Sequence, residues 1–130
     1  MEPKLLKHDV VTYKPANFSG KNESGLTPIG DRVLILPDEV ESKTSGGIEL
    51  PDEILHRQTL AAEAGVIAAL GDGTFKWNSD KVTPFSGRSP QVGERVVIER
   101  YAGQLAKGDD NQLYRLMDSH CIGAILEEAK

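Results

Sequence analysis

The run Arg32-Val33-Leu34-Ile35-Leu36 decides how this chain folds. It is aliphatic after its first residue, and Pro37 ends it. Val and Ile are branched at Cβ, which favours extended backbone, and a run that stays apolar at successive positions is typical of a strand covered on both faces. We therefore predict a buried β-strand at residues 32–36.

Further strand-like runs follow along the chain, and turn residues separate them. Gly71-Asp72-Gly73 has the composition of a tight turn, and so does the polar segment 107–111. Counting the first run, we predict about six strands, joined mainly by hairpins. The fold class is therefore all-β, a small antiparallel β-barrel. The predicted strands are 32–36, 65–70, 95–99, 101–106, 112–117 and 121–126.

Residues 1–26 differ from this strand region. They are polar, carry scattered Pro and Gly, and show no sustained apolar period. We expect an extension outside the main fold with a flexible or peripheral course, in which residues 10–13 could form one short strand. The predicted organisation is thus an extension, 1–26, followed by a single β-barrel domain, 27–130, whose size suits one core.

Residues 52–64 leave two conformations open. Asp52 could cap a helix and the alanines at 61, 62 and 64 would favour one, but the apolar spacing is irregular. A helical turn or two is one outcome, and irregular chain is the other.

The stretch before it, residues 42–51, is polar and contains Gly46 and Gly47 ahead of two aliphatic residues. Glycines lose much backbone freedom on ordering, so we expect a mobile segment. In extended backbone Ile48 and Leu50 point the same way, and Pro51 keeps the residue before it from turning helical. The two side chains then form a hydrophobic hook for a partner, or they fold back onto the core of their own subunit.

Residues 74–91 are mostly polar with Phe75, Trp77 and Phe85 interspersed. They predict a hairpin excursion with a loose tip. The aromatic side chains either pack on the body of the protein or meet a partner.

Charge and composition exclude several classes of function. The formal net charge is −5, with Lys and Arg scattered singly, which argues against nucleic-acid binding. Apolar runs are too short for a membrane span, and the first residues lack the features of a signal peptide, so we predict a cytoplasmic protein that binds no membrane. The single cysteine, Cys121, is expected in a core or an interface.

No catalytic or metal site can be assembled from the sequence. His8, His56 and His120 are far apart, without Cys or carboxylate at ligand spacing. His120 and Cys121 are adjacent, but neighbouring residues of a strand face opposite ways, which is unsuitable for proton transfer. We therefore predict a binding protein without cofactor or metal, and not an enzyme.

Five segments in the same order resemble the GroES-type co-chaperonin family. The similarity covers residues 27–130 and implies a small irregular β-barrel that assembles into a seven-subunit dome. The segments are Pro28 to Leu36, Ser45 to Asp52, Gly65 to Gly73, Val92 to Ile98 and Tyr114 to Met117.

The resemblance also implies a partner and a site. Residues 40–56 become a mobile loop that docks on a GroEL-type chaperonin ring in its nucleotide-bound state, so that the ring and its cap enclose unfolded substrate proteins. Two apolar side chains on each subunit would order on binding, and ring symmetry would multiply these weak contacts. The implied chaperonin-binding residues are Gly46, Gly47, Ile48, Glu49, Leu50 and Pro51.

Other positions take roles from the same resemblance. The excursion 72–91, with Phe75, Trp77 and Phe85, corresponds to a roof hairpin, and Tyr101 to a residue facing the enclosed cavity. Subunit contacts between the first strand and a neighbour's last strand would cover the strand edges. The implied interface residues are Arg32, Val33, Leu34, Ile35, Leu36, Cys121, Ile122, Ala124, Ile125 and Leu126.

The chain departs from the family pattern at Glu49, in the extension 1–26, and in the lengthened segments 52–64 and 72–91. These departures suit a divergent co-chaperonin, for example one encoded by a virus or one that works with a particular chaperonin. They also leave open a structural or decoy protein that kept the barrel without chaperonin activity. A small β-barrel hydrolase or an oligonucleotide-binding module is the remaining alternative.

Overall fold

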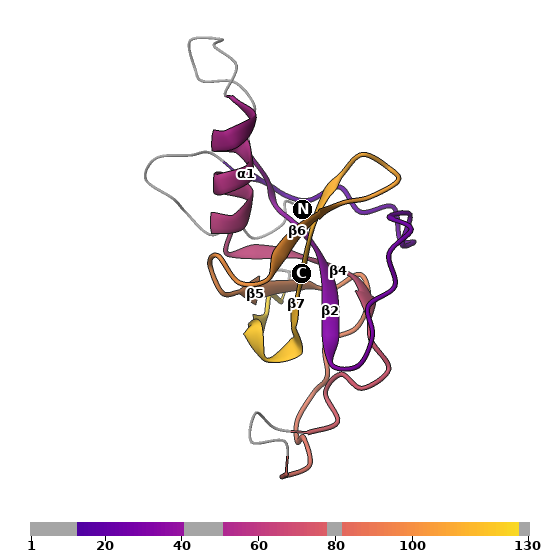
Figure 1. Cartoon of the computed structure of the whole chain (residues 1–130). Helices are drawn as coiled ribbons and strands as arrows, with labels where there is room; N and C mark the ends of the chain where they lie inside the picture. The colour runs from indigo at the N-terminus through magenta and orange to yellow at the C-terminus, as the bar shows by residue number, and fades with distance from the viewer. Residues whose placement is uncertain (1–12, 41–50, 78–81, 128–130) are drawn as a thin grey trace.

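The computed structural model describes residues 13–40, 51–77 and 82–127 (Figure 1). Strands dominate these ranges, with one α-helix and one short 3₁₀ helix. The elements are β1 (Tyr13–Lys14), β2 (Arg32–Pro37), β3 (Glu39–Val40), α1 (Asp52–Ala61), β4 (Ala64–Leu70), β5 (Arg95–Ile98), β6 (Gln104–Lys107), β7 (Leu113–Asp118), η1 (Ser119–Cys121) and β8 (Ile122–Ile125).

Six of the strands form one sheet in the order β6-β7-β2-β4-β5-β8, and every pair of neighbours is antiparallel. β1 and β3 form a separate two-stranded sheet. β2 lies in the middle of the large sheet, between β7 and β4. The predicted all-β fold with antiparallel strands is confirmed.

The side chains of β2 alternate between two hydrophobic clusters, one on each face of the sheet. Val33 and Ile35 belong to the first cluster, whereas Leu34 and Leu36 belong to the second. All four are at most 2% exposed. Successive residues of a strand point to opposite faces, so a run that is apolar at every position is the sequence of a strand with a core on both sides. The prediction of a buried strand at 32–36 is confirmed for these four residues.

The N-terminal segment covers the second cluster. Ala16, Phe18 and Leu26 pack against it. Ser24 is buried, and its carbonyl accepts a hydrogen bond of 2.8 Å from the backbone N–H of Asp109 in the turn after β6. The described part of the predicted extension is therefore in contact with the main sheet, because its apolar side chains complete a core. A domain boundary at residue 26 stays a prediction.

Residues 52–61 form helix α1, which decides between the two conformations that the sequence left open. Pro51 precedes the helix in extended conformation, and the acidic Asp52 and Glu53 occupy its first turn, where the helix dipole favours negative charge. Thr59 and Ala61 are its buried residues. In Figure 1 the helix lies at one end of the molecule and the excursion around 72–90 at the other. No helix in the described ranges is long and apolar enough to cross a membrane.

Candidate functional site

The predicted docking loop, residues 40–56, overlaps two regular elements: Val40 ends β3, and residues 52–56 begin helix α1. Its residues Gly46, Gly47, Ile48, Glu49 and Leu50 lie outside the described residues. Pro51 is described and exposed, and its carbonyl accepts hydrogen bonds of 3.0 Å from the backbone N–H groups of Ile54 and Leu55. The structure shows how the elements on either side of this loop, β3 and α1, are attached to the main sheet.

Asp38 holds the β3 end. It lies between β2 and β3, is 3% exposed, and accepts hydrogen bonds of 2.7 and 3.1 Å from the two terminal nitrogens of Arg95 in β5. Its backbone N–H donates to the carbonyl of Ala64, at 2.9 Å. A two-pronged bond between a buried guanidinium and a buried carboxylate is geometrically specific. The chain therefore leaves the sheet toward the loop from a fixed point.

Arg115 holds the other end, through the C-terminus of α1. This arginine of β7 is completely buried. Its terminal nitrogens donate to the carbonyls of Ala62 (2.7 Å), Glu99 (2.7 Å) and Ala102 (2.9 Å). Sequence reasoning missed this residue, although a single arginine within the apolar run of 113–117 was a usable signal. The side chain joins the end of α1 to the turn 99–103.

Tyr101 lies at the tip of that turn. Its φ is +63°, its side chain is 56% exposed, and its backbone N–H donates to the carbonyl of Leu60 at 2.6 Å. The guanidinium of Arg100 lies 5.3 Å from the centre of the ring. The ring thus faces solvent in the single chain. Whether it faces a cavity in an assembly stays a prediction.

The aromatic residues of the excursion divide into two kinds. Phe75 and Phe85 are partly buried, with ring centres 5.6 Å apart, and Phe75 packs against the first hydrophobic cluster. Trp77 is 49% exposed. The backbone N–H of Phe85 donates to the carbonyl of Lys76 at 3.0 Å, and Trp77 pairs with Pro84 in an isolated antiparallel bridge. The two phenylalanine side chains therefore pack within the subunit, whereas the side chain of Trp77 is half exposed to solvent.

His120 connects the excursion to η1. Its Nδ1 lies 2.8 Å from a carboxylate oxygen of Asp118, and its Nε2 lies 3.2 Å from the carbonyl of Trp77. The hydrogen bond to Asp118 raises the pKa of His120, and the Trp77 carbonyl adds to the effect. The carboxylate of Asp31 approaches the same group, so that ligand atoms of Asp31, Asp118 and His120 lie within 4.8 Å of one another. Because both ring nitrogens of His120 already face protein oxygens, we interpret the group as a hydrogen-bonded link.

The neighbouring Cys121 is not activated. Burial raises the pKa of its thiol, and the Glu99 carboxylate raises it further. A nucleophilic cysteine needs the opposite shift, because the thiolate is the reactive form. The sequence argument against a catalytic pair assumed that His120 and Cys121 lie on a strand, whereas both belong to η1. The absence of a catalytic pair stays a prediction.

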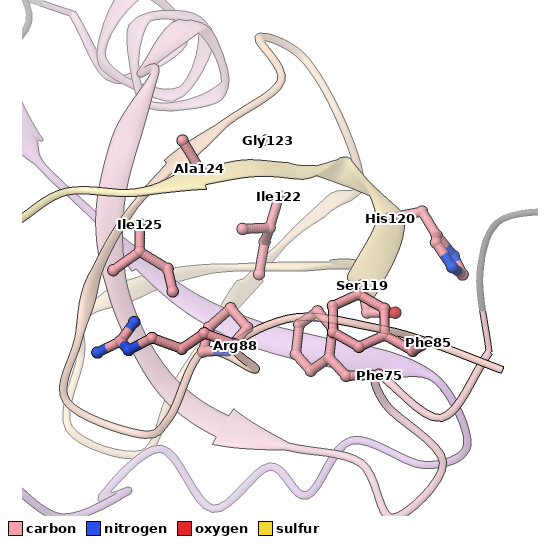
Figure 2. Close-up of a pocket in the computed structure, with 10 residues that line it drawn as sticks. Phe75, Phe85, Arg88, Ser119, His120, Ile122, Gly123, Ala124 and Ile125 are labelled. Atoms are coloured by element: carbon pink, nitrogen blue, oxygen red, sulfur yellow. The ribbon is translucent and has the colours of Figure 1, made fainter.

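A groove of about 620 Å³ lies between the excursion and β8 (Figure 2). Phe75, Phe85 and Arg88 lie on one side of it in the picture, and Ile122 and Ile125 of β8 on the other. β8 is an end strand of the six-stranded sheet and pairs only with β5 among the described residues. The groove therefore runs along an open strand edge.

The predicted subunit interface needs a correction at β2. Val33, Leu34, Ile35 and Leu36 are buried in their own subunit, and β2 has a hydrogen-bonded neighbour on each side. The side chains of Val33, Leu34, Ile35 and Leu36 are therefore not accessible to another chain, and their assignment to the interface is not supported. Arg32, at its start, is exposed.

The β8 half of that interface is different. Ala124 is exposed, whereas Cys121, Ile122, Ile125 and Leu126 are partly buried. These residues are accessible along the open edge, and their contact with another subunit stays a prediction.

Comparison with known proteins gives a consistent result. The family model for the chaperonin 10 Kd subunit matches residues 25–126. A relative named Co-chaperonin GroES from Bacillus sp. (strain PS3) is 34% identical over 100 residues, which are 77% of this chain and 98% of the relative. A protein of the same name from Staphylococcus aureus (strain JH9) is 36% identical over 102 residues, 78% of this chain and 99% of the relative. The chain therefore belongs to the chaperonin 10 Kd subunit family and is a co-chaperonin.

Proposed function

We propose that this co-chaperonin caps a nucleotide-bound GroEL-type chaperonin ring through the loop 40–56, so that unfolded proteins are enclosed beneath it. The observation that supports the proposal is that both elements flanking the loop are fastened to the sheet: the residue before β3 by the Asp38–Arg95 pair, and the C-cap of α1 by Arg115. Both fastenings are buried. The loop residues Ile48 and Leu50 can then bind a partner while the body of the subunit stays unchanged.

The binding step would couple ordering of the loop to the burial of its two aliphatic side chains. Ordering costs about 1–2 kcal/mol per residue, which keeps the affinity of one loop low. Several loops on one ring bind together, because after the first contact the others act at high effective concentration. Release can therefore follow a change in the chaperonin, and the cap itself needs no ATPase chemistry.

The proposed assembly is a ring of seven subunits in the cytoplasm. β8 has one neighbouring strand among the described residues, and a groove lies beside it. Both features support a contact with a second copy of the chain, because an open strand edge can pair with another chain. The excursion with Trp77 lies at the end of the molecule opposite α1 and supports its assignment as the roof (Figure 1). Tyr101, exposed on its turn, is the proposed cavity-facing residue.

Replacing Ile48 and Leu50 together with Asp tests this function. We expect binding to a GroEL-type ring in the presence of ADP to fall below detection, because two charges would have to enter an apolar groove. The mass of the cap in solution should not change. Binding can be measured by co-sedimentation or by titration calorimetry.

Val92→Asp is the matched control. Val92 is an apolar residue, 46% exposed, and lies outside the loop 40–56. We expect this variant to bind like the unmodified protein. Undiminished binding of the double Asp variant would refute the role of the loop.

A further inference from the structure

β1 pairs with the last strand before the docking loop. Tyr13 lies opposite Val40 and Lys14 opposite Glu39, in antiparallel register. Residue 41, the first outside the described range, follows directly. The two residues of β3 that lead into the loop are thus held by an N-terminal strand that comes from far away in the sequence.

Such a short pair of strands is not stable alone, but this one has support from outside. The backbone N–H of Ala16 donates to a carboxylate oxygen of Asp38, at 3.3 Å, and this is the carboxylate that Arg95 binds. Two residues further, Phe18 packs with Ala16 against the second hydrophobic cluster. The segment after β1 is therefore anchored to the sheet independently of β1 itself.

β3 also contacts α1, the helix into which the loop returns. Both arms of the loop therefore meet at β3. The position of β3 affects the starting direction of one arm and the packing of the other.

This arrangement involves residues outside the family match. The match to the family model begins at residue 25. Each of the two relatives described above aligns over nearly its whole length, yet the alignment uses only 77–78% of this chain. Residues 13–18 thus lie in a part of the chain that the family model does not include.

We propose that residues 13–18 are a brace for the docking loop, which holds Glu39 and Val40 in a strand before the partner arrives. The inference rests on the proposed function, because it concerns the affinity of that loop. Residues that are ordered beforehand need not be ordered on binding, so the brace makes association more favourable and dissociation slower. The effect is repeated in every subunit of a ring and is therefore amplified.

Two truncations test the brace. Removal of residues 1–14 deletes β1 and leaves Ala16 and Phe18 in place, whereas removal of residues 1–12 spares β1. We expect the first truncation to weaken binding to a GroEL-type ring in ADP at least tenfold, mainly through faster dissociation. The second should change it less than twofold. Both should keep the unfolding midpoint and the solution mass of the full chain.

Hydrogen exchange gives a readout that does not depend on the partner. In an antiparallel pair only one of the amides of Glu39 and Val40 faces β1, and its exchange should be faster in the chain without residues 1–14 than in the chain without residues 1–12. Equal exchange in the two truncations would overturn the brace.

An engineered disulfide provides the converse test. Tyr13 and Val40 are directly opposite, a spacing at which cysteines can be bridged, so Tyr13→Cys with Val40→Cys in a Cys121→Ala background should lock β1 to β3. We expect the oxidised form to dissociate from the chaperonin no faster than the reduced form. Faster dissociation on oxidation would contradict the proposal.

Failure of the inference can be told apart from failure of the proposed function. If the full chain binds and both truncations bind equally well, the brace is wrong and the docking loop stands. If the full chain does not bind a GroEL-type ring, the proposed function is wrong and the brace falls with it.

Discussion

A completely buried arginine is the least expected residue of this small protein. Desolvating a guanidinium is expensive unless its N–H groups are satisfied, and Arg115 meets this condition with backbone carbonyls from three places in the sequence. One side chain therefore fastens α1, β7 and the turn that carries Tyr101.

Arg115→Met should destabilise the fold by about 3–5 kcal/mol, because the carbonyls of Ala62, Glu99 and Ala102 lose their donor inside the protein. Denaturant unfolding of the two proteins measures the difference. Arg100→Met is the control, since Arg100 is half exposed and its Nε donates to the carbonyl of Ala61 at 3.2 Å. We expect it to cost less than about 1 kcal/mol. Similar losses in the two variants would contradict the role of Arg115.

The His120 link should make stability depend on pH. Its pKa is raised in the folded state by the carboxylate of Asp118. The stabilisation is therefore complete below the unfolded value of about 6.5 and is lost as the pH rises through the folded pKa. For an exposed pair it amounts to about 1 kcal/mol or less.

Comparison with His120→Gln over a pH series isolates this contribution. The difference in free energy of unfolding between the two proteins should be largest below about pH 6 and should shrink at higher pH. A difference that grows with pH would show that the charged form of His120 does not stabilise the fold.

At the level of the structural elements, the junction between β2 and β3 fixes the point at which the chain leaves the sheet for the docking loop. The chain must leave a fully paired central strand and enter a loop, and Asp38 makes this exit rigid through Arg95 of β5. A buried ion pair of this kind contributes little to net stability but determines geometry, because either charge alone in the interior is unfavourable.

Asp38→Leu should therefore cost about 3–5 kcal/mol, whereas Asp38→Leu combined with Arg95→Met should cost less than the single change. The reason is that the single variant keeps a buried guanidinium beside an apolar side chain. Unfolding in denaturant of the two single variants and the double variant gives the coupling energy. Additive losses would mean that the two side chains do not act as a pair.

At the scale of the whole molecule, the sheet ends in two different strands. β6 and β8 are its end strands, and the groove of about 620 Å³ accompanies β8. α1 and the described part of the excursion lie at opposite ends of the subunit (Figure 1). A ring contact along β8 would therefore leave α1 accessible.

Ala124→Lys places a charge on the exposed β8 edge and should prevent ring assembly, since lysine on an edge strand opposes pairing with another chain. The solution mass should fall from about seven chains of 14.1 kDa to a single chain. Ile54→Lys, at an exposed position of helix α1 outside both edge strands, is the matched control and should assemble normally. Normal assembly of the Ala124 variant would exclude this edge.

The local conformations of this protein follow from sequence patterns. The unbroken apolar run 33–36 belongs to a strand with a core on each face, and turn residues separate the other strands as predicted. The order of short motifs was sufficient to identify the family, which the comparisons confirm. Residues 52–64 were left open because their apolar spacing is irregular, and the packing of Thr59 and Ala61 favours the helix.

Contacts between distant residues were decided only by the tertiary structure. Asp38 and Arg95 are separated by 57 positions, and Arg115 and Ala62 by 53. The pairing of β1 with β3 and the burial of Val33 to Leu36 inside their own subunit are of the same kind. The physical reason is that periodicity records which way a side chain points, whereas the identity of its partner depends on how all the strands are ordered in the sheet.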